Sequence, residues 1–527
     1  MKGYKMTSDE KPKFSLGIDI GSSYSCISLC DLSQDPPYWI IKLFGKEGSM
    51  PSGIIPSVIL YDSDGKVVRI GEEALNIYLA GNDTNDTLSN YTLVREFKAQ
   101  FNRQFFLGDD KPVEYEKAYE EFFERLFSAL RDALEIEEGR VCITHPARKK
   151  SEDNIGPRII ALAGRVLGDK FVVEGLDEAS ALVQFLDREE GFLSIKPRKI
   201  LVIDSGGGTT DFAFATASYS LLGSRSPLEI EFTDRRDSGG RDIDQVLYQK
   251  AQEQLGVLVT NPVQKERDLR DLRRNKEMID WTNPEGFKFT IPVDNHNFEF
   301  SEEGFLQAIE PVLLNCLEPI LTMAGLEELD VIVLAGGNSL LPPFRAALEK
   351  TLGESKVQFK YKPRLYPVKV EDVKTAVSKG ASLYVNRTNK QLKFRLGYSV
   401  SIVDEINGRA KILWKQGISF PPRNRRYVET MISNPETSRI KIQRRGESAL
   451  LYDLMFAFTE PVESGLIRAY FEIDGNGYLR YHGEPFGKKN QSKQEMIRQF
   501  LFETTPPSQA DISTMQNSSD SGTMEDT

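Results

Sequence analysis

Two segments of this chain share one pattern, and that pattern constrains the fold more than any other feature. The first, FSLGIDIGSSYSCISLCD, spans residues 14–31, and the second, KILVIDSGGGTTDFAFA, spans residues 199–215. Each contains an apolar strand with Ile-Asp near its end, one further residue, a glycine turn with small hydroxyl residues, and a second alternating strand. Such runs on either side of a short turn predict a β-hairpin. We interpret the pair as an internal duplication of two similar lobes, with a chance similarity of sequence as the alternative.

Both turns carry the residue types that hold phosphate groups. Several backbone N–H groups can converge on one anion where no Cβ is in the way, and glycines in a tight turn allow this. Neither turn is a Walker A loop or contains GxGxxG, so neither is a common nucleotide fingerprint. The candidate phosphate-binding residues are Gly21, Ser22, Ser23 and Tyr24 in the first turn and Gly206, Gly207, Gly208 and Thr209 in the second.

An acidic residue precedes each turn. Asp19 and Asp204 each stand two residues before the first glycine of their turn. Mg²⁺ keeps several waters and takes one or two carboxylates beside phosphates, so these aspartates are candidate magnesium ligands acting through water. Asp211, just after the second turn, could ligate metal or orient an attacking water. The alternative is that these aspartates merely stabilise ordinary hairpins, which a single turn would favour but two matching turns do not.

A third glycine-containing turn, residues 335–339, ends an expected strand and begins a helix. Close approach of the backbone to a flat adenosine or ribose requires glycine. Gly336, Gly337 and Ser339 are therefore candidates for the adenosine side of a nucleotide site. A simple packing turn is the equally weighted alternative.

Strand and helix patterns alternate through the first 386 residues, which predicts an α/β sheet architecture. Strands are expected at residues 140–144 and 330–335, and helices at residues 113–135, 151–167, 178–186, 241–255, 264–280 and 301–324. Residues 394–486 instead contain short alternating runs with turn signals, including DGNG, which is typical of a hairpin. This predicts a separate β-rich domain over 394–486 and a mostly disordered, Pro/Ser/Asp/Thr-rich tail over 487–527.

The composition excludes several classes of protein. The formal charge is −11, with 67 Lys and Arg against 78 Asp and Glu, whereas a nucleic-acid surface needs clustered cations. The four cysteines have no paired spacing, which excludes a zinc site or disulfide framework and indicates a reducing compartment. The N-terminus lacks a signal-peptide pattern, and no run of about 18 apolar residues occurs. We therefore expect no membrane span and a cytoplasmic location, with the nucleus as an alternative.

Taken together, these segments resemble the 70-kDa heat-shock protein (DnaK-like) family of the actin-like ATPase superfamily. GIDIGSSYSCI looks like its first phosphate loop, VIDSGGGTTDFAFA like its second, and VIVLAGGNSLLPPFRAAL like its adenosine segment. CITHPA resembles the strand that ends at the family's switch proline, here Pro146, and DSGGRDID resembles the loop that starts a nucleotide-facing helix. VKTAVSKGASLY resembles the segment that closes the ATPase domain, and AYFEIDGNGYLRYHG is similar to a strand pair of the substrate-binding sandwich.

The resemblance implies a two-lobed, ribonuclease H-like ATPase domain over residues 14–386 and a smaller β-sandwich-like domain after it. ATP or ADP would bind with Mg²⁺ in a central cleft, where positioning and charge neutralisation carry phosphoryl transfer to water. Asp19 and Asp204 would surround the hydrated Mg²⁺, and Asp211 would lie near the attacking water. Lys98 would reach the γ-phosphate, with Arg95 in reserve. Further nucleotide contacts are implied for Gly239, Gly240, Arg273 and Lys276.

The sequence also departs from the family pattern. The family's catalytic glutamate and the proline after it align with Leu176 and Asp177, so Glu174 or Asp177 would have to substitute. Misplacing a catalytic group by about 1 Å can lower the reaction rate roughly a hundredfold, so we expect slow or absent hydrolysis. Arginines replace two adenine-side acids at Arg241 and Arg273, and guanidinium groups can stack on a purine. The acidic-leucine linker is not visible, and the tail is too short for the helical lid, as in divergent lidless relatives.

The leading hypothesis is an ATP-binding, chaperone-like protein that binds unfolded or client polypeptides, with co-chaperones as further partners. Control of that binding by ATP hydrolysis is left open, because the catalytic glutamate is replaced. The alternatives are a nucleotide-bound scaffold without turnover, a small-molecule kinase of the same superfamily, and an actin-like filament protein. The oligomeric state stays open.

Overall fold

The structure is a computed structural model, and it divides the chain into two compact units. Unit 1 comprises residues 1–145, 158–176 and 374–388, and unit 2 comprises residues 146–157, 177–373 and 389–527. The structure describes residues 14–30, 38–41, 53–80, 91–107, 111–134, 136–147, 155–186, 198–217, 229–279, 281, 287–323, 325–355, 357, 359, 361–369, 372–386, 393–395, 400–403, 410–414, 419–420, 426–431, 437–444, 450–457, 466–473, 478–485 and 495–500.

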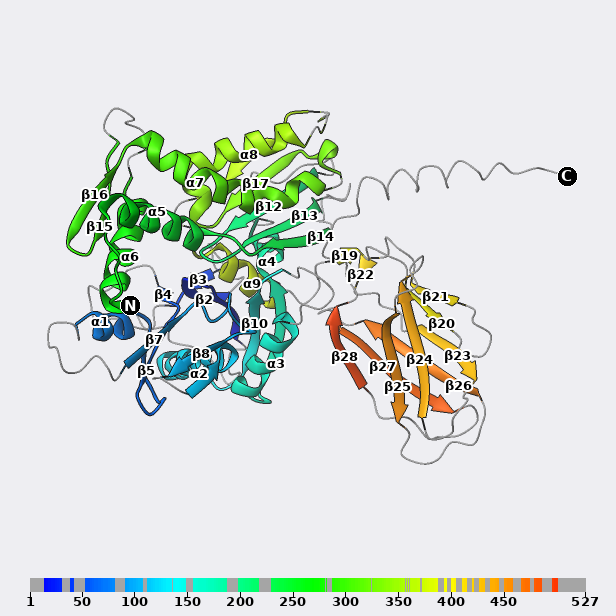
Figure 1. Cartoon of the computed structure of the whole chain (residues 1–527). Helices are drawn as coiled ribbons and strands as arrows, with labels where there is room; N and C mark the ends of the chain where they lie inside the picture. The colour runs from blue at the N-terminus through cyan, green and yellow to red at the C-terminus, as the bar shows by residue number, and fades with distance from the viewer. Residues whose placement is uncertain are drawn as a thin grey trace, which may run out of the picture. The chain divides into compact units, whose positions relative to one another are not determined.

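A six-stranded sheet forms the centre of unit 1 (Figure 1). The first expected hairpin is present, because β1 (Phe14–Ile20) pairs antiparallel with β2 (Tyr24–Cys30) around the first turn. On its other side β1 pairs parallel with β10 (Gly139–His145), and the order across the sheet is β11-β10-β1-β2-β3, with β4 also on β2. The remaining strands of this sheet are β3 (Tyr38–Ile40), β4 (Ile54–Pro56) and β11 (Phe171–Asp177).

Helices and two small antiparallel sheets complete unit 1. Helix α9 packs against β1, β2 and β10. It approaches so closely that a Cβ on Gly17 of β1 would lie 2.0 Å from the carbonyl oxygen of Ser378. The helices are α1 (Gly71–Ala80), α2 (Tyr115–Leu134), α3 (Ile155–Leu167) and α9 (Ala376–Asn386). The strands are β5 (Val58–Asp62), β6 (Val67–Ile70), β7 (Tyr91–Arg95), β8 (Gln104–Leu107) and β9 (Lys111–Glu114).

A seven-stranded sheet forms the centre of unit 2 and contains the second expected hairpin. Strand β12 (Arg198–Ser205) pairs antiparallel with β13 (Thr210–Ala217) around the second turn and parallel with β17 (Val331–Ala335). The order is β18-β17-β12-β13-β14-β19-β22. The other members are β14 (Glu229–Arg236), β18 (Arg364–Pro367), β19 (Lys393–Arg395) and β22 (Ser419–Phe420).

The two central sheets repeat one strand order. Each hairpin is flanked by a parallel strand on the side of its first member, β10 beside β1 and β17 beside β12. Each is flanked by an antiparallel strand on the side of its second member, β3 beside β2 and β14 beside β13. This shared strand order favours internal duplication over chance similarity, because a chance match of short motifs would not extend to the neighbouring strands.

Apolar residues from four of the described helices of unit 2, all except α4, form one large core with the sheet. Helix α4 packs against β12 and β13, and α7 runs beside α8 (Figure 1). Their bounds are α4 (Glu178–Leu186), α5 (Gly240–Leu255), α6 (Pro262–Glu277), α7 (Glu302–Leu317) and α8 (Pro342–Glu354). Short 3-10 turns cover Glu318–Thr322, Leu326–Glu328 and Gly337–Leu340, and β15 (Phe289–Val293) pairs with β16 (His296–Phe300).

The six expected helices are confirmed within a few residues. The expected helix 178–186 matches α4 at both ends. The expected helix 301–324 instead divides into α7 and a 3-10 turn that begins at Glu318, one residue before Pro319. Since proline has no N–H to donate, it favours a change of helix type at this point.

Among the described residues, one helical stretch, Glu302–Thr322, is long and apolar enough to cross a membrane. Of its most apolar 18 residues, 44% are buried inside the protein, and Phe305, Ile309 and Leu313 belong to the core of unit 2. A core helix passes the same test of length and composition, so this stretch is weak evidence for a membrane span.

Residues after 399 form two four-stranded antiparallel sheets, ordered β21-β20-β24-β25 and β23-β26-β27-β28. Strands β26 and β27 pair antiparallel on either side of DGNG, as expected for a hairpin, although residues 474–477 themselves lie outside the described residues. The strands are β20 (Val400–Val403), β21 (Ala410–Trp414), β23 (Arg426–Met431), β24 (Thr437–Arg444), β25 (Leu450–Ala457), β26 (Leu466–Ile473), β27 (Tyr478–Pro485) and β28 (Glu495–Phe500).

The segment expected to be a mostly disordered tail, residues 487–527, contains one described strand. Strand β28 pairs with β27. Its short apolar patch supplies a strand to an open sheet edge, which offers unpaired backbone donors and acceptors. The rest of the expected tail lies outside the described residues, and the separate β-rich domain over 394–486 stays a prediction. The mixture of sheets and helices is consistent with an actin-like ATPase architecture.

Candidate functional site

The second turn, in unit 2, is closed by its own backbone and held by two other segments. The N–H of Gly206 donates to the carbonyl of Thr209 at 2.9 Å. The outward carbonyl of Gly206 accepts from the N–H of Gly240 at 3.0 Å and from the side-chain amide of Asn338 at 2.8 Å. The N–H of Arg241 donates to the carbonyl of Gly207 at 2.7 Å. The turn therefore contacts both the start of α5 and the third turn.

Two glycines of the neighbouring segments are required for this close approach. A Cβ on Gly239 would lie 2.7 Å from the carbonyl oxygen of Gly206. A Cβ on Gly336 would lie 2.2 Å from the carbonyl oxygen of Ser205 and 2.5 Å from Oδ1 of Asp204, and Gly336 has φ +77°. Real Cβ atoms do not approach backbone this closely, so larger residues at either position would push the segments apart.

Three glycine turns that are far apart in the sequence therefore meet in unit 2. They lie at residues 206–209, 239–240 and 336–339, and the sequence assigned all three to nucleotide contacts. By contrast, a Cβ on Gly337 would meet nothing within 4 Å, so the packing requirement does not extend to it. Ser339 is buried, and its hydroxyl donates to the carbonyl of Gly336 at 2.8 Å, which fixes the third turn.

Asp204 and Asp211 are directly opposite each other on β12 and β13. Residues in register across antiparallel strands project to the same face, so the two side chains lie on one face beside the second turn. Asp204 is 7% exposed and Asp211 is fully buried. The Asp211 carboxylate accepts from the N–H of Ala147 at 2.7 Å and from the hydroxyl of Thr209 at 2.7 Å. Asp211 thus positions Thr209 and the residue that follows Pro146.

Burial raises the pKa of Asp211 well above its usual value, and the negative charge of Glu178 raises this pKa further. Arg235 and the two hydrogen bonds act in the opposite direction. Glu178 and Arg235 did not emerge from the sequence analysis. A signal for Glu178 was present, because an Asp-Glu pair between a strand and a helix is typical of a helix start.

The first turn, in unit 1, closes in the same way as the second. The N–H of Gly21 donates to the carbonyl of Tyr24 at 3.0 Å, which repeats the bond from Gly206 to Thr209. The carbonyl of Ser23 accepts from the N–H of Ser57 at 2.9 Å, and Ser23 is exposed. The equivalent backbone closure supports the equivalence of the two turns that the sequence indicated.

Asp19 and Lys98 meet in unit 1. The ammonium of Lys98 lies 3.5 Å from Oδ1 of Asp19, and the hydroxyl of Thr144 donates to the same oxygen at 2.6 Å. The Lys98 side chain is only 2% exposed, whereas most lysines are solvated. Arg95, the reserve candidate, is the last residue of β7.

The two carboxylates proposed as substitutes for the catalytic glutamate have other partners. Glu174 accepts from the guanidinium of Arg140 at 2.6 Å in unit 1. Asp177 accepts from the N–H of Ser180 at 2.9 Å and from its hydroxyl at 2.5 Å, which is the bonding of a helix N-cap. Leu176 is buried. Asp177 therefore begins α4, and neither carboxylate is placed by these contacts to orient a water.

The cations expected on the adenine side are bound to carboxylates within unit 2. Arg273 lies 3.0 Å from Asp244 and 3.5 Å from Glu266, and Lys276 lies 2.5 Å from Asp244. Arg241 lies 3.4 Å from its neighbour Asp242. The ion pairs of Arg273 and Lys276 with Asp244 hold α6 against α5, a role that the charge pattern of the sequence did not reveal.

The residue types at the turns suit a nucleotide with Mg²⁺ in each unit taken by itself. In unit 2 the three turns are in close backbone contact, because Cβ atoms on Gly239 and Gly336 would clash with backbone oxygens of the second turn's segment. Asp204 in unit 2 and Asp19 in unit 1 each offer carboxylate oxygens, the ligand type that Mg²⁺ prefers. Among the described residues, no group of three or more His, Cys, Asp or Glu side chains is placed to hold a metal.

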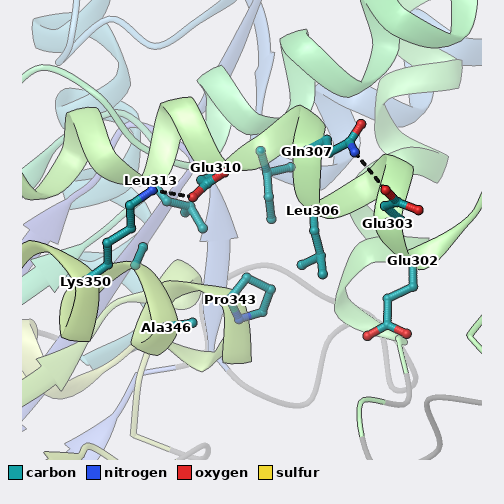
Figure 2. Close-up of a pocket in the computed structure, with 11 residues that line it drawn as sticks. Glu302, Glu303, Leu306, Gln307, Glu310, Leu313, Pro343, Ala346 and Lys350 are labelled. Carbon is teal, nitrogen blue, oxygen red and sulfur yellow. Dashed lines mark hydrogen bonds and ion pairs between the residues drawn. The ribbon is translucent and has the colours of Figure 1, made fainter.

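Unit 2 also has a groove of about 510 Å³ between α7 and α8 (Figure 2). Its lining joins the apolar side chains of Leu306, Leu313 and Pro343 to an acidic rim, and Lys350 forms an ion pair across it with Glu310 at 2.8 Å. Except for Lys350, the part of the lining that α8 supplies belongs to the segment VIVLAGGNSLLPPFRAAL, which the sequence analysis compared with the adenosine segment of the family.

No protein-family model matches the chain. Its sequence does resemble that of a heat shock protein. A heat shock protein of Pyricularia oryzae is 23% identical over an alignment that covers 88% of this chain and 79% of the relative. This similarity supports the resemblance to the 70-kDa heat-shock proteins at the level of the family, and it extends beyond the nucleotide motifs.

Proposed function

We propose that this protein binds ATP or ADP with Mg²⁺ and acts as a chaperone-like protein related to the 70-kDa heat-shock family. The observation that carries the proposal is the meeting of three glycine turns around Asp204 in unit 2. A packing turn needs one tight contact, whereas here two glycines from different segments, Gly239 and Gly336, are both required beside the second turn. The similarity to a heat shock protein over most of the chain adds independent support.

In this proposal the glycine turns bind phosphate. In unit 2 the backbone N–H groups of Gly207 and Gly208 and the hydroxyl of Thr209 bind phosphate oxygens, and bound Mg²⁺ would neutralise phosphate charge beside Asp204, largely through its own waters. Gly336 and Gly337 of the same unit take the adenosine side, where the absent side chains allow close approach. In unit 1 the first turn offers Ser22 and Ser23, donors of the same kind, beside Asp19.

Turnover is a separate question, and the structure favours a second candidate function, nucleotide binding without hydrolysis. Leu176 is apolar and buried where the family has its glutamate, Asp177 caps α4, and Glu174 pairs with Arg140. An enzyme that cannot orient the attacking water loses most of its positioning advantage. We therefore expect hydrolysis to be slow or absent although binding is retained.

The chaperone part of the proposal concerns unfolded or client polypeptides. The two antiparallel sheets after residue 399 are the candidate peptide-binding region, by resemblance to the family's sandwich. A small-molecule kinase of the same superfamily would leave these strands unexplained. Stimulation of ATP turnover by a metabolite but not by unfolded peptides would favour the kinase.

Binding and turnover of Mg·ATP by the full chain test the proposal. Gly207→Asp places a carboxylate where phosphate oxygens should lie, so we expect binding to weaken by at least a hundredfold, about 2.7 kcal/mol. Asp204→Ala should weaken the dependence of binding on Mg²⁺. Absence of binding by the wild-type protein would overturn the site. Tight binding without turnover would identify the nucleotide-bound scaffold.

A further inference from the structure

The groove between α7 and α8 is an elongated surface of unit 2 (Figure 2). Its lining runs from Glu302 to Leu313 on α7 and from Pro343 to Lys350 on α8. At a rise of about 1.5 Å per residue, these stretches correspond to roughly 16 Å and 10 Å of helix. The groove therefore extends over about two to three helical turns, which is the length of a short helix lying in it.

Apolar side chains form both the floor and the opening of this groove. Ile309 and Leu313 at the floor are buried and belong to the core of unit 2. Leu306 and Pro343 are partly exposed, and Ala346 is exposed. A helix binds such a groove through apolar side chains at positions i, i+3, i+4 and i+7 of one face. The burial of apolar surface on both partners supplies the affinity.

The rim of the groove is acidic. At one end Lys350, the cation among the described lining residues, forms its ion pair with Glu310. Glu302 and Glu303 lie at the other end (Figure 2), so three glutamates and one lysine give the lining a net charge of −2. The formal charge of −11 on the whole chain acts in the same direction. A complementary partner therefore carries Lys or Arg beside its apolar face, whereas an acidic partner is repelled.

We propose that the groove between α7 and α8 binds a basic amphipathic helix of a partner protein. The apolar face of that helix covers Leu306, Pro343 and Ala346, and its Lys or Arg side chains pair with Glu302 and Glu303. This surface shares no lining residue with the glycine turns, so the inference does not depend on the proposed nucleotide site. Acidic residues in the first turn also stabilise α7 itself through the helix dipole, so the test measures folding and binding separately.

The test uses the full chain and a labelled synthetic helix of about four turns, with leucine at i, i+3, i+4 and i+7 and lysine elsewhere. Fluorescence anisotropy measures its dissociation constant. Ala346→Trp fills the groove from an exposed position, so this constant should rise at least about tenfold. Glu302→Gln combined with Glu303→Gln removes two ion pairs near the surface, so it should rise about fivefold, with a shallower salt dependence. A peptide of the same composition with scattered leucines should bind at least about tenfold more weakly.

Glu327→Gln combined with Glu328→Gln is the matched control, because these adjacent exposed glutamates of unit 2 lie outside the groove lining and the change in net charge is identical. This control should bind the peptide within about twofold of the wild type. Thermal melting without peptide shows which variants are folded, and if Ala346→Trp is not, the two glutamate pairs decide. No binding by the wild type, or equal weakening by both glutamate pairs, would overturn the inference. Dimerisation of the wild type that Ala346→Trp abolishes would also overturn it, because a second copy would then occupy the groove.

Discussion

Replacement of Gly336 by alanine should disrupt the point where the three turns of unit 2 meet. The new Cβ would lie 2.2 Å from the carbonyl oxygen of Ser205 and 2.5 Å from Oδ1 of Asp204, at a residue with φ +77°. The left-handed conformation costs an L-residue roughly 1–2 kcal/mol. Forcing an atom into a packed site typically costs a further 1–3 kcal/mol or so. We therefore expect Gly336→Ala to destabilise unit 2 by about 2–5 kcal/mol.

Gly337→Ala provides the control for this prediction, because the same methyl group would meet nothing within 4 Å and Gly337 is not at positive φ. Differential scanning calorimetry of both variants without nucleotide measures the effect. For a cooperative unit of about 350 residues, the size of unit 2, 1 kcal/mol corresponds to roughly 1.5 °C. Gly336→Ala should thus lower the transition by roughly 3–8 °C, and Gly337→Ala by less than about 1 °C. Equal midpoints for the two variants would refute the close approach.

Three further predictions follow from contacts and pKa shifts. Asp177→Ala should lower the free energy of unfolding in urea by about 1 kcal/mol because it removes the cap of α4, whereas Asp177→Asn should keep most of that stability. Equal losses in the two variants would show that the residue does not cap the helix. The raised pKa of Asp211 means that the folded state holds its proton more tightly, so wild-type stability falls as pH rises from 3.8 through the folded pKa. The stability of Asp211→Asn relative to the wild type should therefore grow over that pH range. A difference in free energy of unfolding that does not change with pH would contradict the raised pKa of Asp211. Burial raises the pKa of Cys26 to about 12, and all four cysteines are buried, so a thiol reagent at about pH 8 should label the protein only after unfolding.

The hairpins and the glycine turns were predictable from the sequence, because their signals are local. Alternating apolar residues around residues 21–24 and 206–209 predict strand, turn and strand. Helix α4 was predicted at both ends, since Asp177 supplies a cap and the apolar run ends at Leu186. The repeated motif predicted two similar lobes, and the shared strand order of the two sheets is a finding of the structure that agrees with it.

The contacts between distant segments were not predictable. Asn338 is 132 residues from Gly206, and nothing in either local pattern indicates that its amide binds that carbonyl. The charged sequence of α6 did not indicate that Arg273 and Lys276 form ion pairs with Asp244 of α5. Charge pairing across elements depends on how helices pack, which a periodic pattern does not contain.

Two further features depend on contacts that a local pattern does not contain. Glu178 was expected to begin a helix, but its effect on the pKa of Asp211 depends on how α4 packs against the hairpin. Strand β28 lies within the segment expected to be mostly disordered, since a short apolar patch in polar sequence cannot be distinguished as a strand without its partner strand β27.

Amide hydrogen exchange of the full chain, with and without Mg·ATP, tests the central claim most directly. It reports on the backbone N–H groups that we propose to bind phosphate. Peptides that contain residues 21–24, 206–210, 239–241 and 336–339 should exchange more slowly with nucleotide, and Gly207→Asp should abolish this protection. Unchanged exchange in all four segments at saturating Mg·ATP, or protection confined to other parts of the chain, would contradict the account.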